Sequence, residues 1–264
     1  MYDYEVNRFK ENIRSDIDPD ISEKAGLFYQ EFFPELWSTK DALHLRGETM
    51  CSLATTFGLD NTEGEFKPIC HAKLRDRRYT MSMTSRDKDR FKTFRQQYHS
   101  LANFLLIPKE LNHWRGRTDG CRQGDYFDIF LYIIFRYYLD RNSLNPNVRE
   151  VFRKTNVQTW LCQFGNGKAG WQKFIVYNYL DSFVNSALEV KDLFSEPDEF
   201  KKENCIRLIG EYHQYGTPYP EQVTKDSDSG NMFPGFNPAV HYMENCLWIW
   251  DKRASLLKKK QINV

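Results

Sequence analysis

The clearest element in the sequence is the stretch DYFDIFLYIIFRYYLDR, residues 125–141. At the helical period of about 3.6 residues, Asp125, Asp128, Tyr132 and Arg136 share one narrow face, and nearly every other residue is apolar. A helix that is apolar around most of its circumference is buried in a globular protein. The stretch therefore predicts a buried helix at the centre of the core.

Two long amphipathic helices are expected to pack against this central helix. From about Gly170 to Phe194, and again after Pro238, apolar residues recur at helical spacing. They are Val176, Leu180, Phe183, Ala187, Val190 and Phe194 in the first helix, and Val240, Met243, Leu247, Trp250, Ala254 and Leu257 in the second. Shorter helices are expected within 20–37, over 86–98 and over 196–212. The second half of the chain is thus predicted to be helical.

The first half is predicted to contain short strands as well as helices. Residues 2–10 alternate loosely between apolar and polar side chains, and 101–107 is an apolar segment that ends at Pro108. Between residues 40 and 85, glycines interrupt short alternating runs such as 79–83. These runs predict a small sheet.

The predicted fold class is α+β, a mainly α-helical single domain of residues 1–264 with a small antiparallel sheet in its N-terminal half. Residues 1–122 would form a mixed α/β part and residues 123–264 a helical part. A chain of 264 residues can bury a core without disulfide or metal staples, and an aromatic content of 16% excludes disorder for most of it.

Cysteine usage and hydropathy point to a cytoplasmic protein. The six cysteines include no Cys-x-x-Cys pair, so they are expected to be reduced thiols. No apolar run is long enough to cross a bilayer, and the first residues do not resemble a signal peptide. We therefore expect no membrane partner.

Charge is distributed unevenly along the chain. The whole sequence has a net charge of +1, but residues 67–122 contain fourteen Lys and Arg against five Asp and Glu, a net charge of +9. Clustered cations bind phosphates through counterion release, and the interleaved aromatic residues can stack on bases. The alternative is a solvated charged face with the aromatic residues in the core.

The aromatic residues concerned are Tyr79, Phe91, Phe94, Tyr98 and Trp114. The candidate nucleic-acid-binding residues are Arg75, Arg77, Arg78, Arg90, Lys92, Arg115 and Arg117.

The block HSLANFLLIPKELNHWRG, residues 99–116, resembles the second half of the ββα-metal motif of His-Asn-His nucleases. The resemblance implies a divalent metal that Asn112 and His113 would hold. If the protein is catalytic, Asp125 and Asp128, two carboxylates one helical turn apart, are expected to complete the site. The histidine that this motif places upstream of its Asn is missing. The alternative is a strand and turn with capping asparagines and, at the helix start, capping carboxylates.

A glycine pattern marks a second candidate site. Gly165, Gly167 and Gly170 satisfy G-x-G-x-x-G ahead of a predicted helix, where backbone N–H groups can approach a phosphate. A dinucleotide fold would continue to a strand that ends in an acidic residue, whereas this chain continues to the charged stretch 195–199. A small-molecule enzyme and a plain flexible helix entry both stay open, and no cofactor besides a divalent metal is evident.

The order of motifs resembles an uncharacterised bacterial family with a domain of unknown function. The motifs are the opening Tyr-Asp segment, Asp18-Pro19-Asp20, Leu36-Trp37-Ser38, the block Asn103–Lys109, the Arg115-Gly116 turn and the helix with Asp125, Asp128 and Arg136-Tyr-Tyr138. The resemblance covers about residues 2–195 and implies no activity.

Our leading hypothesis is a bacterial or phage-associated protein, with a role in defence, that binds nucleic acid through residues 67–122. The alternative is a non-catalytic assembly protein that binds a protein partner, or a second copy of itself. It would use the apolar seam of the C-terminal helix or the loop 215–238.

Overall fold

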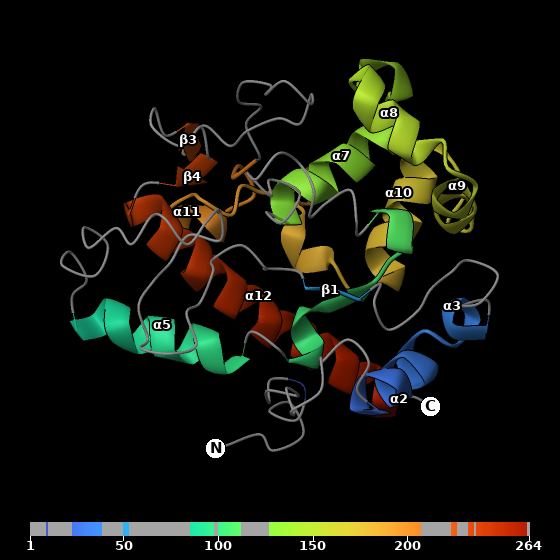
Figure 1. The fold of residues 1–264 in the computed structure, drawn as a ribbon. Helices are drawn as coiled ribbons and strands as arrows, with labels where there is room; N and C mark the ends of the chain where they lie inside the picture. The colour runs from blue at the N-terminus through green and yellow to red at the C-terminus, as the bar shows by residue number, and fades with distance from the viewer. Residues whose placement is uncertain are drawn as a thin grey trace.

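The structure is a computed structural model that describes residues 9, 23–38, 50–52, 85–97, 100–111, 127–206, 223–225, 232–234 and 236–262. Within these residues the protein is mainly helical, as predicted (Figure 1). The α-helices are α2 (Glu23–Phe32), α3 (Pro34–Ser38), α5 (Ser85–Gln97), α7 (Phe127–Leu139), α8 (Pro146–Phe152), α9 (Thr155–Cys162), α10 (Gly167–Tyr177), α11 (Pro197–Phe200) and α12 (Phe236–Ile262). The 3-10 helices are η3 (Leu101–Asn103), η5 (Arg141–Ser143) and η6 (Asp181–Phe183).

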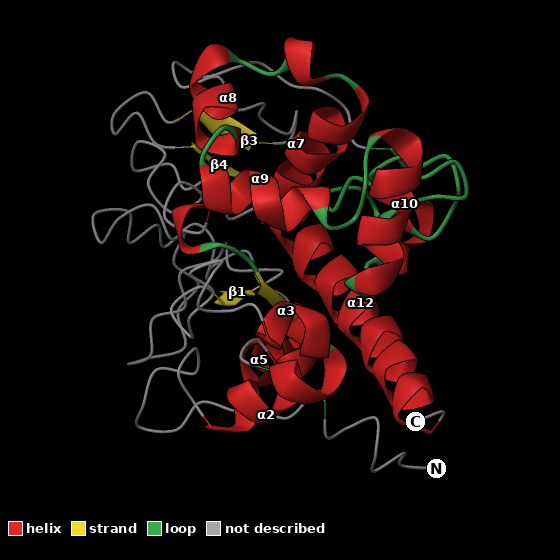
Figure 2. Ribbon diagram, turned by 90° about the vertical axis from the view of Figure 1, so that its right-hand side faces the viewer, coloured by secondary structure: helices red, strands yellow, loops and turns green. Residues whose placement is uncertain are grey.

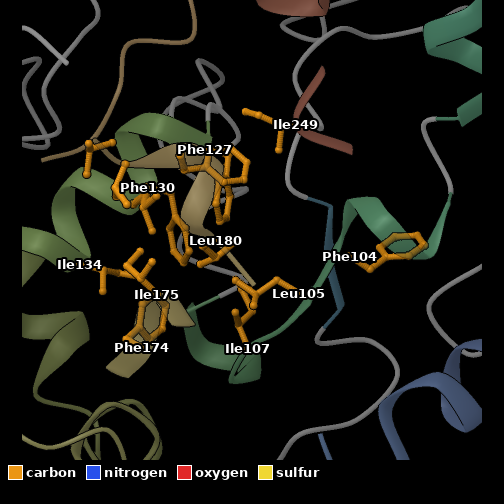
Figure 3. Packing of buried hydrophobic residues seen from close by; sticks show 14 of the residues in the cluster. Phe104, Leu105, Ile107, Phe127, Phe130, Ile134, Phe174, Ile175, Leu180 and Ile249 are labelled. Carbon is orange, nitrogen blue, oxygen red and sulfur yellow. The ribbon is translucent and has the colours of Figure 1, made fainter. Parts of the chain in front are cut away.

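Helix α7 is the buried helix that the sequence predicts. All of its residues except Phe135, Arg136 and Leu139 are buried. Two members of the expected polar face, Asp128 and Tyr132, are buried as well, and Asp125 lies outside the described residues. Figure 3 shows side chains from α7 and α10 gathered with those of Leu105 and Ile107, whereas Phe104 lies apart from them in this view.

Helix α12 is the longest helix of the described chain and contacts elements from both halves of the sequence. It packs against α5 and η3 of the first half and against η6 and α11 of the second. Figure 1 shows it running across the molecule beside α5. Its predicted seam is buried except for the half-buried Leu247, so the protein's own residues cover the surface on which we expected a partner.

A fully buried arginine fastens α12 to two other segments. The guanidinium of Arg253 donates hydrogen bonds to the carbonyl oxygens of Leu101 (3.3 Å), Ala102 (2.8 Å) and Asn178 (3.3 Å from Nη2). Burial lowers the pKa of Arg253 to about 10, so it is still charged at neutral pH. Its charge-assisted hydrogen bonds offset the cost of burying the cation.

The predicted long helix over 170–194 is wrong. Helix α10 begins at Gly167 and ends at Tyr177, and Tyr179 then has a left-handed φ of 56°. Val176, an expected core position, has 56% of its surface exposed, whereas Leu180 is buried although it follows the end of the helix. After Tyr177 the buried apolar side chains come from turns, from the short 3-10 helix η6 and from an isolated bridge, which place them at helix-like intervals without a continuous α-helix.

The loop after α10 is held by its own polar groups. The amide of Asn178 donates to the Phe174 carbonyl (2.9 Å). The backbone N–H of Glu189 donates to the Asn185 side chain (2.8 Å), and Val184 and Val190 form an isolated antiparallel bridge. The helix expected over 196–212 is described only to residue 206 and consists there of the short α11 followed by turns.

Strands are short in the described chain. Strand β1 (Met50–Ser52) pairs antiparallel with β2 (Phe104–Leu106), with Cys51 opposite Leu105. Strand β3 (Val223–Lys225) pairs in the same way with β4 (Met232–Pro234) (Figure 2). Apart from β1 and Ser85, residues 40–85, where most of the sheet was expected, lie outside the described residues, as does the predicted strand 2–10 except Phe9.

No described helix is both long enough and apolar enough to span a membrane.

Candidate nucleic-acid interface

Helix α5 carries the described part of the basic segment, and two contacts anchor it to α12. The ring of Phe94 is fully buried and stacks on Trp250, with 5.0 Å between ring centroids. Arg90, four residues earlier, forms an ion pair with Glu244. The residue spacing places Phe94 and Arg90 on one helix face, which is the face toward α12.

Two cations of α5 among the described side chains are exposed, and they lie on different sides of the helix. Lys92 is on the side away from Phe94, whereas Arg86 is in the first turn, four residues before Arg90, which is only partly exposed because it is turned toward Glu244. Phe94 cannot stack on a base, because α12 covers it. Helix α5 therefore offers positive charge for contacts to phosphates, but the ring of Phe94 is not available for stacking on bases.

Most of the other predicted residues lie outside the described residues. These are Arg75, Arg77, Arg78, Asn112, His113, Arg115, Arg117 and Asp125 in the binding and metal sets, and Tyr79, Tyr98 and Trp114 among the aromatic residues. Three of the four predicted metal ligands thus lie outside the described residues, and the roles of all four stay predictions.

Asp128 has a clear structural environment. It is completely buried, one carboxylate oxygen accepts from the backbone N–H of Ile129 (3.0 Å), and the other accepts from that of Leu193 (3.2 Å). Burial, together with the nearby charge of Asp128, raises the pKa of the Cys246 thiol of α12. Asp128 thus links the start of α7 to the loop at Leu193, next to α12.

No group of three or more His, Cys, Asp and Glu side chains that could hold a metal ion is found among the described residues.

The G-x-G-x-x-G turn has a steric explanation. Gly165 and Gly167 have φ values of +95° and +60°, which other residues rarely adopt. A Cβ on Gly170 would lie 2.6 Å from the backbone carbon of Gly165 and 3.1 Å from the ring of Tyr138. The three glycines therefore allow the tight connection between α9 and α10.

Residues of α7 and η5 stabilise the turn between α9 and α10. Arg141 lies over the ring of Tyr137, 4.2 Å from its centroid, and donates from Nη2 to the side chain of Asn166 (3.3 Å). The side chain of Asn166 makes no hydrogen bond that caps α10, although the residue is in the N-cap position. Burial raises the pKa of Tyr137, so its hydroxyl stays protonated.

A second group of cations, which the sequence analysis did not single out, lies near this turn. Five Lys and Arg side chains of η5, of the turn between α8 and α9, and of α10 are exposed. They are Arg141, Arg153, Lys154, Lys168 and Lys173. Residues 136–173 contain seven Lys and Arg against two Asp and Glu, a net charge of +5, and the same count of charges used for 67–122 would have found them.

Comparisons with known proteins give one match. A family model described as "Family of unknown function (DUF6994)" matches residues 35–227, which is more than half of the chain. The matched range includes α5, α7 and the turn at Gly165–Gly170. No curated protein and no solved structure matches the chain.

Proposed function

The chain belongs to the family of unknown function whose model matches residues 35–227, and we propose that it binds nucleic acid through the basic segment 67–122. The observation that carries the proposal is the net charge of +9 of this segment in a chain whose total is +1. A local excess of this size attracts a polyanion even where the whole molecule is nearly neutral.

The geometry of α5 supports this role. Its apolar anchor, Phe94, and its paired cation, Arg90, face α12, so the helix is fixed to the longest helix of the described chain. Arg86 and Lys92 are exposed and available to phosphate oxygens. A fixed helix with exposed cations can contact phosphates with little loss of conformational entropy.

Binding by this segment would be mainly electrostatic. Arg115 and Arg117 would add phosphate contacts, as would Arg75, Arg77 and Arg78. A nuclease reaction would additionally need a metal site, for which we predicted Asn112, His113, Asp125 and Asp128. The binding proposal does not depend on such a reaction, because it rests on the charge of the segment. Both carboxylate oxygens of Asp128 already accept backbone hydrogen bonds, which gives this residue a structural role.

The test is a salt titration of the full chain with fluorescent single- and double-stranded DNA and RNA, with and without magnesium and manganese. We expect the logarithm of the binding constant to fall steeply and linearly with the logarithm of salt concentration. The double variant R86E/K92E should reduce the steepness of this line by about 2 and weaken binding at least tenfold near 0.1 M salt, by an order-of-magnitude estimate.

The matched control is K201E/K202E, which makes the same change in net charge at two exposed lysines that pair with Asp198 and Glu199. It should leave the affinity within a few fold of wild type. An absence of binding at low salt would refute the proposal, and equal losses in both variants would show a response to net charge alone. Shortening of the probe only when a metal ion is added would add nuclease activity to the function.

A further inference from the structure

We propose that the exposed cations of η5, of the turn between α8 and α9, and of α10 form a second basic surface, which binds duplex nucleic acid through its phosphate backbone. This inference rests on the proposed function and extends it to a different part of the molecule. The surface is defined by Arg141, Arg153, Lys154, Lys168 and Lys173.

The cations of this surface are not neutralised by the described protein. None of the five forms an ion pair within the part of the chain that the structure describes. One of the two acids in 136–173, Asp140, already pairs with Arg136 (3.2 Å). The following residues, 174–206, have seven Asp and Glu against three Lys, a net charge of −4. Within residues 136–206, the excess positive charge therefore ends at Lys173.

Aromatic contacts hold helices α8, α9 and α10 together as one body. Phe152 of α8 lies 5.3 Å from the ring of Tyr137 in α7, and Trp160 of α9 lies 5.5 Å from Phe174 in α10. The hydrogen bond from Arg141 to Asn166 ties η5 to the start of α10. In Figure 1 the three helices crowd together at one end of the molecule, beside α7. The exposed cations of the surface are therefore carried on a rigid support.

The absence of an exposed ring indicates which nucleic acid would bind. Residues 141–173 are all described, and their four aromatic side chains, Phe152, Trp160, Phe164 and Trp171, are all buried. Proteins that bind single strands without sequence preference stack bases on exposed aromatic rings, whereas phosphate contacts alone suit a duplex. A surface of lysine and arginine without an exposed aromatic ring therefore favours duplex over single-stranded nucleic acid. Contacts to phosphates alone would not distinguish one base sequence from another.

The same lack of rings argues against a membrane surface. Proteins that lie on a lipid interface usually insert aromatic or bulky apolar side chains beside their cations. All four aromatic side chains of 141–173 are in the core, and in α10 the ring of Tyr177 is half-buried, so that Val176 is the exposed bulky apolar side chain of this helix. A polyanion with regularly spaced phosphates is thus the better fit.

The surface can be tested separately from α5. Figures 1 and 2 both show α5 well apart from α8 and α10, so changes at one place should not disturb the other. We would compare R153E/K154E and K168E/K173E with wild type, using a 30-base-pair duplex, a single strand of the same sequence, and vesicles of phosphatidylcholine and phosphatidylserine. All four substituted side chains are exposed, and thermal unfolding would check that each variant keeps its fold.

Each double variant should weaken duplex binding at least tenfold near 0.1 M salt and reduce the salt dependence by about 2, by an order-of-magnitude estimate from counterion release. Binding of the single strand should change much less. The control K201E/K202E changes the net charge equally within the acidic stretch and should leave duplex binding within a few fold of wild type.

Three results would overturn the inference. They are duplex binding that neither double variant weakens, a loss of duplex affinity in only one of R153E/K154E and K168E/K173E, and preferential binding of the protein to the vesicles. If R86E/K92E still weakens binding in those cases, the proposed function survives and only this surface is rejected. If the wild type binds no nucleic acid at all, both proposals fail together.

Discussion

Asp128 is a buried carboxylate whose two oxygens accept hydrogen bonds from the backbone N–H groups of Ile129 and Leu193. We expect Asp128→Asn to lower the free energy of unfolding by about 2 kcal/mol. The asparagine side chain has a single acceptor oxygen, so only one of the two backbone N–H groups would keep its acceptor. The other would face the NH₂ group, which cannot accept a hydrogen bond. Urea denaturation followed by tryptophan fluorescence would measure the change.

Asp140→Asn is the matched control at the other end of the same helix. Asp140 is exposed and pairs only with Arg136, so its loss should cost less than about 1 kcal/mol. An Asp128→Asn protein as stable as wild type would contradict the structural role. If it also lost a metal-dependent cleavage that the wild type performs, Asp128 would be a catalytic residue instead.

At the scale of elements, the α9–α10 connection depends on one backbone contact. A Cβ on Gly170 would meet the backbone carbon and oxygen of Gly165 at 2.6 and 2.8 Å, and neither atom can move without shifting the turn. We expect Gly170→Ala to destabilise the protein by about 3 kcal/mol, at the upper end of overpacking costs. Differential scanning calorimetry would show the lower melting temperature.

Gly167→Ala separates backbone strain from overpacking. A Cβ there meets no atom within 4 Å, so only the φ of +60° opposes the substitution, at a cost of about 1 kcal/mol. An equal loss of stability in Gly167→Ala and Gly170→Ala would argue against the close contact between Gly170 and Gly165. A Gly170→Ala protein that melts like wild type would show that the turn can open without penalty.

At the scale of the whole molecule, α12 joins the two halves of the chain. It supplies Trp250 to α5, Arg253 to η3 and Asn245 to the carbonyls of Leu193 and Ser195. A chain that ends at residue 239 should therefore lose cooperative unfolding and its near-ultraviolet circular dichroism. The buried residues of several other elements would be exposed to water together.

A chain that ends at Lys259 keeps Leu257, the last residue of the buried seam, and should unfold like wild type. Sedimentation of the wild type and both shortened chains would complete the test. A folded monomer obtained from a dimer by the longer deletion would contradict an internal role for α12 and identify it as an interface.

The candidate site was predictable from the sequence only in part. The charge excess of 67–122 and the helix over 86–98 could be read from the residues, and α5 confirms the helix. The sequence could not show that Phe94 faces Trp250 and that Arg90 pairs with Glu244, since these partners are about 150 residues away in the chain. Helices α8 and α9 were missed, together with the exposed Arg153 and Lys154 of the turn between them, because both helices are short and their apolar repeat spans two turns at most.

The sequence by itself determined that the chain is mainly helical, that α7 is buried and that α12 has a long apolar seam. Each of these follows from periodicity within one segment, which is a local property. Only the tertiary structure decided that the chain turns after Tyr177 and that Arg253 is buried. It also decided that the five cations from Arg141 to Lys173 named above stay exposed and without ion pairs among the described residues. Periodicity indicates most of the buried positions, but it also placed Val176 in the core, where the structure exposes it. The backbone between the buried positions, and the partners of each charge, depend on segments that meet only when the chain folds.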